Sequence, residues 1–199
     1  MRQNLHLLVL LFSLFQMCTD DCALDMNGHR FQNPQPIPTF QLESVFGKNV
    51  LSNQDLQGQY VVLDFFFTRC PSICKKMTAN MARIQKELKG IDGFSMVSIS
   101  IDEKNDSRSI LRQYADGVQA DTTKWSFLRG TRDEVFNLAN AFKLGVSESD
   151  LPTSNGFEHS GTFLVINPDG KVSYHVKGDG SNDQEIDALI CFLKNELTH

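Results

Sequence analysis

The segment GQYVVLDFFFT, residues 58–68, is the strongest constraint on how this chain can fold. It is an almost continuous apolar run that is bounded by Gly58 and Thr68. A run of this length and composition is typical of a strand that is buried on both faces of a sheet. Such a strand needs a layer on each side, so the segment predicts an α/β fold in which it is the central strand.

Helical and strand patterns alternate after this strand. Residues 72–90 predict a helix that ends in glycine, and residues 94–102 predict a second buried strand. A helix, a short strand, a helix, a hairpin that turns at 167–170 and a final helix follow. The segment FQLESVFGKNVLS, residues 40–52, predicts an N-terminal β-hairpin extension. Together with a cysteine pair at the first strand-to-helix junction, this order predicts a thioredoxin-like fold, a central mixed sheet flanked by helices.

The chain divides into three predicted parts. Residues 1–22 are interpreted as a signal peptide or a membrane or lipid anchor, residues 23–38 as a proline-punctuated tether, and residues 39–199 as one thioredoxin-like domain. Hydrophobic residues make up 41% and charged residues 22% of the chain, which is typical of a globular protein. The net charge of −5 and the absence of a basic block argue against nucleic-acid binding.

The N-terminus predicts the compartment. Arg2 precedes the apolar run Leu5–Met17, over which a helix would span only ~20 Å of the ~30 Å hydrocarbon core. This pattern is typical of a secretory signal. Cys18 follows the run directly, where a bacterial lipoprotein carries its lipid, although Met17 stands where a small residue is expected. We therefore expect a bacterial cell envelope or periplasmic protein with membrane association through the N-terminus.

Five cysteines are present, and they differ in their expected surroundings. Cys18 and Cys22 lie in the N-terminal parts. Cys191 lies on the apolar face of the last predicted helix and is interpreted as a small buried hydrophobe. Cys70 and Cys74 are therefore the pair that is placed for chemistry.

Cys70 and Cys74 follow the central strand, at or near the start of the predicted helix. Residues i and i+4 of a helix share a face, so the two sulfurs could form a disulfide or bind one metal ion. Unpaired N–H groups and the helix dipole favour thiolates at this end. The pair could thus be a disulfide catalyst, a metal site or a structural staple. The staple is disfavoured because so short a loop gains little stability.

His159 is the candidate third partner of the pair. It stands in GFEHSGTFLVI, at the end of a long polar loop and directly before a predicted buried strand. Two thiolates and an imidazole suit copper, since soft sulfur ligands select Cu(I) and an imidazole suits either valence. Zinc would require a fourth ligand. Thiol oxidoreductases of this fold carry a proline at this approach to the strand, and its absence here favours a metal site.

The segments FFFTRCPSIC, SISIDEKNDS, WSFLRG and FEHSGTFLVINPDGKV are similar, in order and spacing, to the SCO/SenC family of copper-binding, thioredoxin-like proteins. The resemblance covers about residues 38–197 and departs at Ser72, where the family typically has an aspartate. It implies that Cys70, Cys74 and His159 bind one copper ion, as Cu(I) or Cu(II). It also implies a copper metallochaperone that delivers copper to, or prepares the thiols of, the copper site of cytochrome c oxidase. The partner would then be a copper-accepting oxidase subunit.

The alternative is an extracytoplasmic thiol-disulfide oxidoreductase. Cys70 and Cys74 would then be the catalytic residues and would form a redox disulfide, which a thiol reductant protein would reduce. Some members of the family resemble such reductases, so whether this chain is an enzyme stays open. Asp102 and Asp106 match acidic positions of the family and could support the metal site or contact a partner. The acidic start of a helix would explain both equally well.

Overall fold

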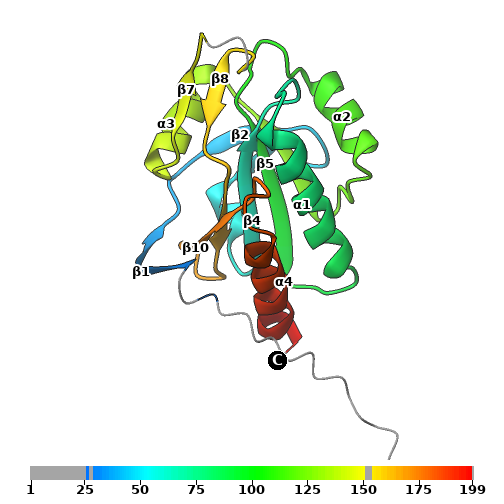
Figure 1. Ribbon diagram of the computed structural model, residues 1–199, viewed down its shortest axis with the longest axis vertical. Helices are drawn as coiled ribbons and strands as arrows, with labels where there is room; N and C mark the ends of the chain where they lie inside the picture. The colour runs from blue at the N-terminus through cyan, green and yellow to red at the C-terminus, as the bar shows by residue number, and fades with distance from the viewer. Residues whose placement is uncertain (1–25, 27–28, 151–153, 199) are drawn as a thin grey trace, which may run out of the picture.

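The computed structural model describes residues 26, 29–150 and 154–198 (Figure 1). Its core is an eight-stranded mixed sheet with the strand order β1-β10-β9-β4-β5-β6-β2-β3. The segment expected to be central is β4, which pairs in parallel with β5 and antiparallel with β9. The predicted mixed sheet is therefore confirmed. Its strands are β1 (Arg30–Pro36), β2 (Gln41–Ser44), β3 (Val50–Ser52), β4 (Tyr60–Phe66), β5 (Phe94–Ser100), β6 (Trp125–Arg129), β9 (Thr162–Ile166) and β10 (Lys171–Lys177).

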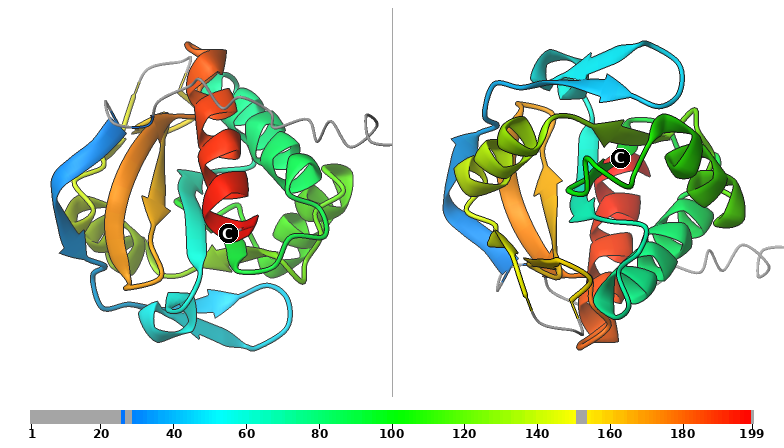
Figure 2. Two further views of the ribbon diagram at one scale, coloured as in Figure 1. Left: turned by 90° about the horizontal axis from the view of Figure 1, so that it is seen from below. Right: turned by 90° about the horizontal axis from the view of Figure 1, so that it is seen from above.

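Helices cover both faces of this sheet. Figure 2 shows α1, α2 and α4 on one side and α3 on the other. Successive side chains of a strand point to opposite faces, and β4 follows this rule. Phe65 meets Phe142 beyond the end of α3, whereas Phe66 meets Tyr114 of α2, at ring-centroid distances of 6.2 and 5.3 Å. The helices are α1 (Ile73–Glu87), α2 (Arg108–Gly117), α3 (Arg132–Ala141) and α4 (Asp183–Thr198), and a short 3₁₀ helix spans Asn53–Leu56.

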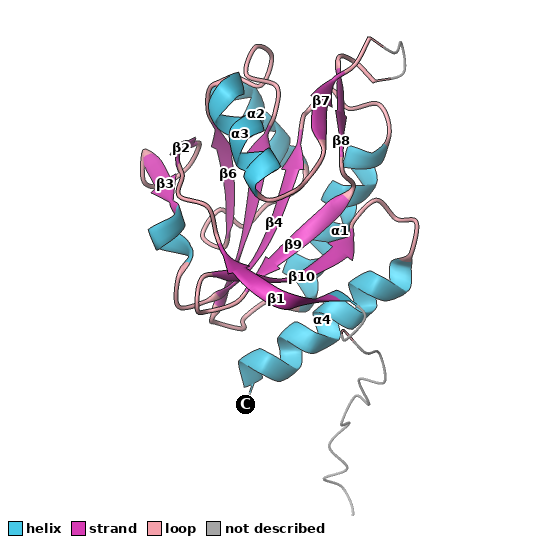
Figure 3. Cartoon of the chain, turned by 90° about the vertical axis from the view of Figure 1, so that its left-hand side faces the viewer, coloured by secondary structure: helices cyan, strands magenta, loops and turns pink. Residues whose placement is uncertain are grey.

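The N-terminal region contributes more to the sheet than the sequence predicts. The expected hairpin is confirmed, since β2 and β3 pair antiparallel. Residues 30–36, however, lie within the segment 23–38 that was expected to be a tether, and they form β1 instead. β1 pairs antiparallel with β10 at the edge of the sheet (Figure 3). Prolines are tolerated at such an edge, so the proline-punctuated sequence does not prevent a strand.

The long polar loop expected before His159 is partly a second, two-stranded sheet. β7 (Val146–Glu148) pairs antiparallel with β8 (Phe157–His159). The pairing continues beyond the strands through a bond of 2.9 Å from the Ser160 N–H to the Gly145 carbonyl. His159 is therefore carried by a strand and is positioned more firmly than a loop residue would be.

Cys191 is disulfide-bonded and partly exposed, so its interpretation as a simple buried hydrophobe is wrong. Cys70 and Cys74 are both free thiols. Helical periodicity places Cys191 on one face of α4, but it does not indicate whether its sulfur is bonded. Among the described residues, every helix is too short or too polar to cross a membrane.

Candidate metal centre

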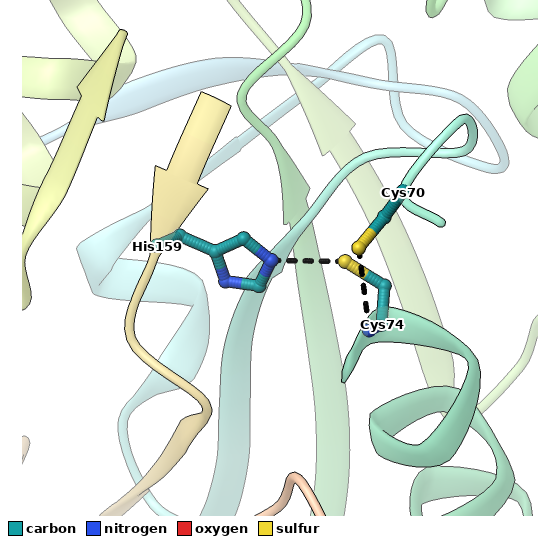
Figure 4. Close-up of side chains that lie close together, drawn as sticks. All are labelled: Cys70, Cys74 and His159. Atoms are coloured by element: carbon teal, nitrogen blue, oxygen red, sulfur yellow. Dashed lines mark hydrogen bonds between the residues drawn. The ribbon is translucent and has the colours of Figure 1, made fainter. Parts of the chain in front are cut away.

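Cys70, Cys74 and His159 come together at one end of the sheet. The two sulfurs and a ring nitrogen of the histidine all lie within 4.8 Å of one another. Cys70 precedes α1, Cys74 lies in the first turn of α1, and His159 ends β8 (Figure 4). Within the described part of the chain, they form the one cluster of three such side chains that could hold a metal ion. Cys74 and His159 are 85 positions apart in the sequence.

Cys70 lies outside the helix, so the expected i,i+4 relation within one helix is wrong. The N-cap of α1 is Ser72. A residue before a proline avoids the helical region, and Cys70 precedes Pro71. The sulfurs still meet, because the chain turns between Phe67 and Cys70, where the Cys70 N–H donates to the Phe67 carbonyl at 3.2 Å. The Cys70 sulfur then accepts the N–H of Cys74 at 3.4 Å, one of the N–H groups that a helix start leaves unpaired.

His159 presents one defined ring nitrogen to the cysteines. Its Nδ1 lies 3.0 Å from the Ser160 carbonyl, which can only accept a hydrogen bond, so the proton of the neutral ring is on Nδ1. The lone pair of Nε2 therefore faces Cys74, whose Sγ is 2.9 Å away. A hydrogen bond on the far nitrogen is how proteins orient a metal-binding histidine. The sequence does not predict this hydrogen bond to the Ser160 carbonyl, because every residue has a main-chain carbonyl.

The two cysteines differ in acidity. A hydrogen bond from Cys74 lowers the pKa of Cys70 well below the ordinary value for a thiol; burial opposes this effect, and hydrogen bonds from the main-chain N–H groups of Ser72 and Cys74 support it. The pKa of Cys74 is raised by the same cysteine–cysteine hydrogen bond and by burial. At neutral pH the pair therefore holds one proton, with Cys70 as the thiolate and Cys74 as the thiol.

This difference predicts a pH profile. In the reduced, metal-free protein, we expect the alkylation rate of Cys70 by iodoacetamide to change little between about pH 6 and pH 9, because its thiolate is already formed. In Cys74→Ala, the largest cause of the lowered pKa is lost, so the rate should rise with pH over the same range. Peptide mapping by mass spectrometry measures both rates. A wild-type rate that climbs tenfold per pH unit would contradict the lowered pKa of Cys70.

A family model for SCO1/SenC matches residues 28–194. The chain belongs to the SCO1/SenC family. A SCO1/SenC family lipoprotein from Bacillus anthracis is 30% identical, with a TM-score of 0.72 over 85% of this chain and 99% of that one. BsSco, a member of the Sco family of cytochrome c oxidase assembly proteins with a disulfide switch, is also 30% identical, with a TM-score of 0.68 over 84% of this chain and 98% of that one. The family resemblance and the thioredoxin-like fold predicted from the sequence are thereby confirmed.

A third structure is Arabidopsis thaliana ScoI with copper bound. It is 20% identical to this chain, with a TM-score of 0.67 over 81% of this chain and 99% of that one. At this identity the likeness concerns the fold.

In this SCO1/SenC chain, Asp106 holds the turn that leads to Cys70. Its side chain is completely buried. It accepts hydrogen bonds from the Thr68 N–H at 3.0 Å, from Thr68 Oγ1 at 2.5 Å and from Ser100 Oγ at 2.5 Å. Burial raises the pKa of the Asp106 carboxyl, and these hydrogen bonds oppose that effect.

Asp102 binds the residue next to Cys70. Its carboxylate, which is 1% exposed, lies 2.9 Å from the guanidinium of Arg69. Neither Asp102 nor Asp106 caps helix α2, because the N-cap is Ser107, whose side chain accepts the Ile110 N–H. The explanation of the two acids as a helix start is therefore wrong. Both act on the segment before Cys70, and neither belongs to the cluster of the two cysteines and the histidine.

A cleft of about 310 Å³ opens beside the cluster. Cys70 and His159 line it, together with the ring of Phe157 and the polar side chains of Ser72 and Glu158. The cluster is therefore mostly buried but still reachable from one side, which ligand exchange with another protein requires.

Proposed function

We propose that this SCO1/SenC chain is a copper metallochaperone that binds one copper ion through Cys70, Cys74 and His159. The observation that carries the proposal is the convergence of two sulfurs and an imidazole nitrogen within 4.8 Å. Two soft sulfur ligands select Cu(I), and the imidazole suits copper of either valence. A structural zinc site would require a fourth ligand.

The protonation state of the side chains fits a metal of this kind. Thiolate sulfur and neutral imidazole nitrogen are the forms that bind metals. Cys70 already carries a lowered pKa, and the Ser160 carbonyl keeps the proton of His159 on Nδ1, away from the cysteines. Only Cys74 has to lose a proton on loading, and His159 Nε2 lies 2.9 Å from its sulfur.

Delivery to cytochrome c oxidase is the second part of the proposal. BsSco belongs to a family of cytochrome c oxidase assembly proteins, and ScoI of Arabidopsis thaliana binds copper with the same fold. The partner is therefore a copper-accepting protein, an oxidase subunit whose copper site this chain loads or whose thiols it prepares. The cleft beside Cys70 gives such a partner access to the ligands.

The proposed location is the bacterial cell envelope, outside the cytoplasm. The apolar run Leu5–Met17 followed by Cys18 supports an N-terminal anchor, and the Bacillus anthracis family member is a lipoprotein. The disulfide at Cys191 supports an oxidising compartment. Cys70 and Cys74 would need a thiol reductant protein there to remain available for copper.

Thiol-disulfide exchange is the second candidate function, and the thiolate character of Cys70 favours it. The Cys70 thiolate would attack a client disulfide and release one client sulfur as a thiolate. Cys74 would pass its proton to His159 and attack the Cys70 sulfur. The client would leave with both sulfurs reduced, and Cys70 and Cys74 would be left as a disulfide.

Copper titration distinguishes the two functions. We expect the reduced protein to bind one copper ion and the protein with an oxidised Cys70–Cys74 pair to bind none, since a disulfide offers no thiolates. Cys70→Ala, Cys74→Ala and His159→Ala should each weaken binding sharply. The oxidoreductase would be favoured if the reduced wild type retained no copper but rapidly reduced a model disulfide, and if His159→Ala reduced that disulfide equally fast.

A further inference from the structure

Besides the contact between Cys74 Sγ and His159 Nε2, a side-chain-to-main-chain hydrogen bond joins the segment that carries the cysteines to the segment that carries the histidine. We call residues 67–74 the cysteine arm and residues 154–160 the histidine arm. The side-chain Nδ2 of Asn155, in the turn before β8, donates to the main-chain carbonyl of Arg69 at 2.6 Å. Arg69 directly precedes Cys70, and Asn155 stands four residues before His159.

The acceptor end of this bond is fixed to the sheet. The Arg69 guanidinium pairs with Asp102, just beyond the end of β5, at 2.9 Å. Asp102 is itself held, because its carboxylate accepts the Asn105 N–H at 3.1 Å. The neighbouring residue Thr68 is bound by the buried Asp106. The cysteine arm is therefore a firm support for whatever binds its carbonyl groups.

The donor end lies in a turn that suits asparagine. Asn155 has a φ of +50°, a left-handed conformation that asparagine adopts far more readily than most residues. Gly156 follows with a φ of +99°. Its carbonyl accepts the Ser149 N–H at 3.0 Å, which joins the turn to the segment after β7. The turn thus directs the Asn155 amide at the cysteine arm and leads directly into β8.

The apolar contacts between the two arms do not fix their relative direction in the way that the Asn155 hydrogen bond does. Phe67 meets Phe157 and His159 edge to face, with centroid distances of 5.4 and 5.9 Å. Such ring contacts tolerate sliding, whereas a hydrogen bond weakens steeply when its geometry changes.

We propose that Asn155 is a positioning residue for the metal centre, which holds His159 Nε2 over the cysteines by tying the histidine arm to the Arg69 carbonyl. This inference rests on the proposed copper site. Metal affinity depends on how well the ligands are arranged before the metal arrives, and outer contacts that orient a ligand contribute to it. A single bond of this kind, at an exposed position, corresponds to an affinity change of about three- to tenfold.

Two substitutions of Asn155 test its hydrogen bond to the Arg69 carbonyl without straining the backbone. Asn155→Gly removes the donor and keeps the left-handed conformation, and we expect it to weaken Cu(I) binding about three- to tenfold in competition with a chromophoric chelator. Asn155→Asp keeps the size and places a carboxylate oxygen against the Arg69 carbonyl, so its loss should be at least as large. Gln119→Gly, the same change at another left-handed residue, is the matched control and should leave affinity unchanged.

The decisive comparison is made in a His159→Ala background. If Asn155 acts through the histidine, Asn155→Gly should have no further effect on Cu(I) affinity once that histidine is absent. An equal loss in both backgrounds would mean that Asn155 supports the cysteine arm or the fold, which overturns the proposal. An unchanged affinity in Asn155→Gly alone would overturn it as well.

A second readout needs no metal. In metal-free Asn155→Gly, we expect faster hydrogen exchange at the Ser160 amide, which bonds to Gly145, while amides within α4 stay as in the wild type. A wild type that takes up no copper would defeat the proposed function. The exchange comparison would still decide whether Asn155 holds the histidine arm, and unchanged exchange at Ser160 would refute it.

Discussion

Cys74→Ser is expected to abolish tight copper binding while the protein stays folded. The substitution keeps the shape of a side chain that is only 1% exposed, and it replaces a soft thiolate with a hydroxyl that stays protonated at neutral pH. Contacts that merely orient ligands are worth about 10- to 100-fold in metal affinity, so loss of a ligand should cost at least about 100-fold. Competition with a chromophoric Cu(I) chelator measures the change.

Ser72→Ala is the matched control for this experiment. Ser72 lines the same cleft, and its hydroxyl lies 4.0 Å from the Cys70 sulfur, but it is not one of the three proposed ligands. The Ser72→Ala variant should bind copper nearly as tightly as the wild type. If Cys74→Ser bound copper as tightly as Ser72→Ala does, the metal would have to lie elsewhere in the chain.

The parts of the site that the sequence predicts are those marked by residue type. Cys70, Cys74 and His159 are rare, chemically distinctive residues at the ends of predicted elements, so a thioredoxin-like order of elements already places them together. The sulfurs do not meet on a shared helical face, however. Pro71 keeps Cys70 out of α1, and a turn together with a sulfur-to-N–H bond replaces the expected helical face.

The parts that the sequence does not predict depend on backbone groups and on distant segments. The tautomer of His159 follows from the Ser160 carbonyl, and the joining of the two arms follows from the Arg69 carbonyl. β1 pairs with β10 although the intervening chain is long, and its polar, proline-containing sequence also fits a tether. Periodicity describes one segment at a time, so it is silent on such pairings.

Asp106 shows the same limit, and its burial makes it important for the stability of the fold. An acid shortly before a helix fits a helix start, and only the fold reveals that Asp106 is buried beneath the turn before Cys70. Asp106→Ala would leave the Thr68 N–H, the Thr68 hydroxyl and the Ser100 hydroxyl without their acceptor. An unpaired buried donor costs about 1–3 kcal/mol, so we expect a loss of at least about 3 kcal/mol in the free energy of unfolding. Urea denaturation of the metal-free protein measures it.

Asp116→Ala, at an exposed acid on α2, is the control and should change stability by less than about 0.5 kcal/mol. A loss as small as this in Asp106→Ala would contradict the proposed support of the cysteine arm.

The pH dependence of Asp106→Asn separates hydrogen bonding from charge. Burial raises the pKa of Asp106 in the folded state, so the folded protein binds more protons than the unfolded chain between the ordinary carboxyl pKa of about 3.9 and the raised value. Wild-type stability should therefore fall as the pH rises through that window, and the asparagine variant, which cannot titrate, should lack this fall. The stability advantage of the wild type over Asp106→Asn should thus be largest at the acidic end. If the stability difference between the wild type and Asp106→Asn stayed constant across the window, the hydrogen bonds from Thr68 and Ser100 would fully offset the cost of burying the carboxylate.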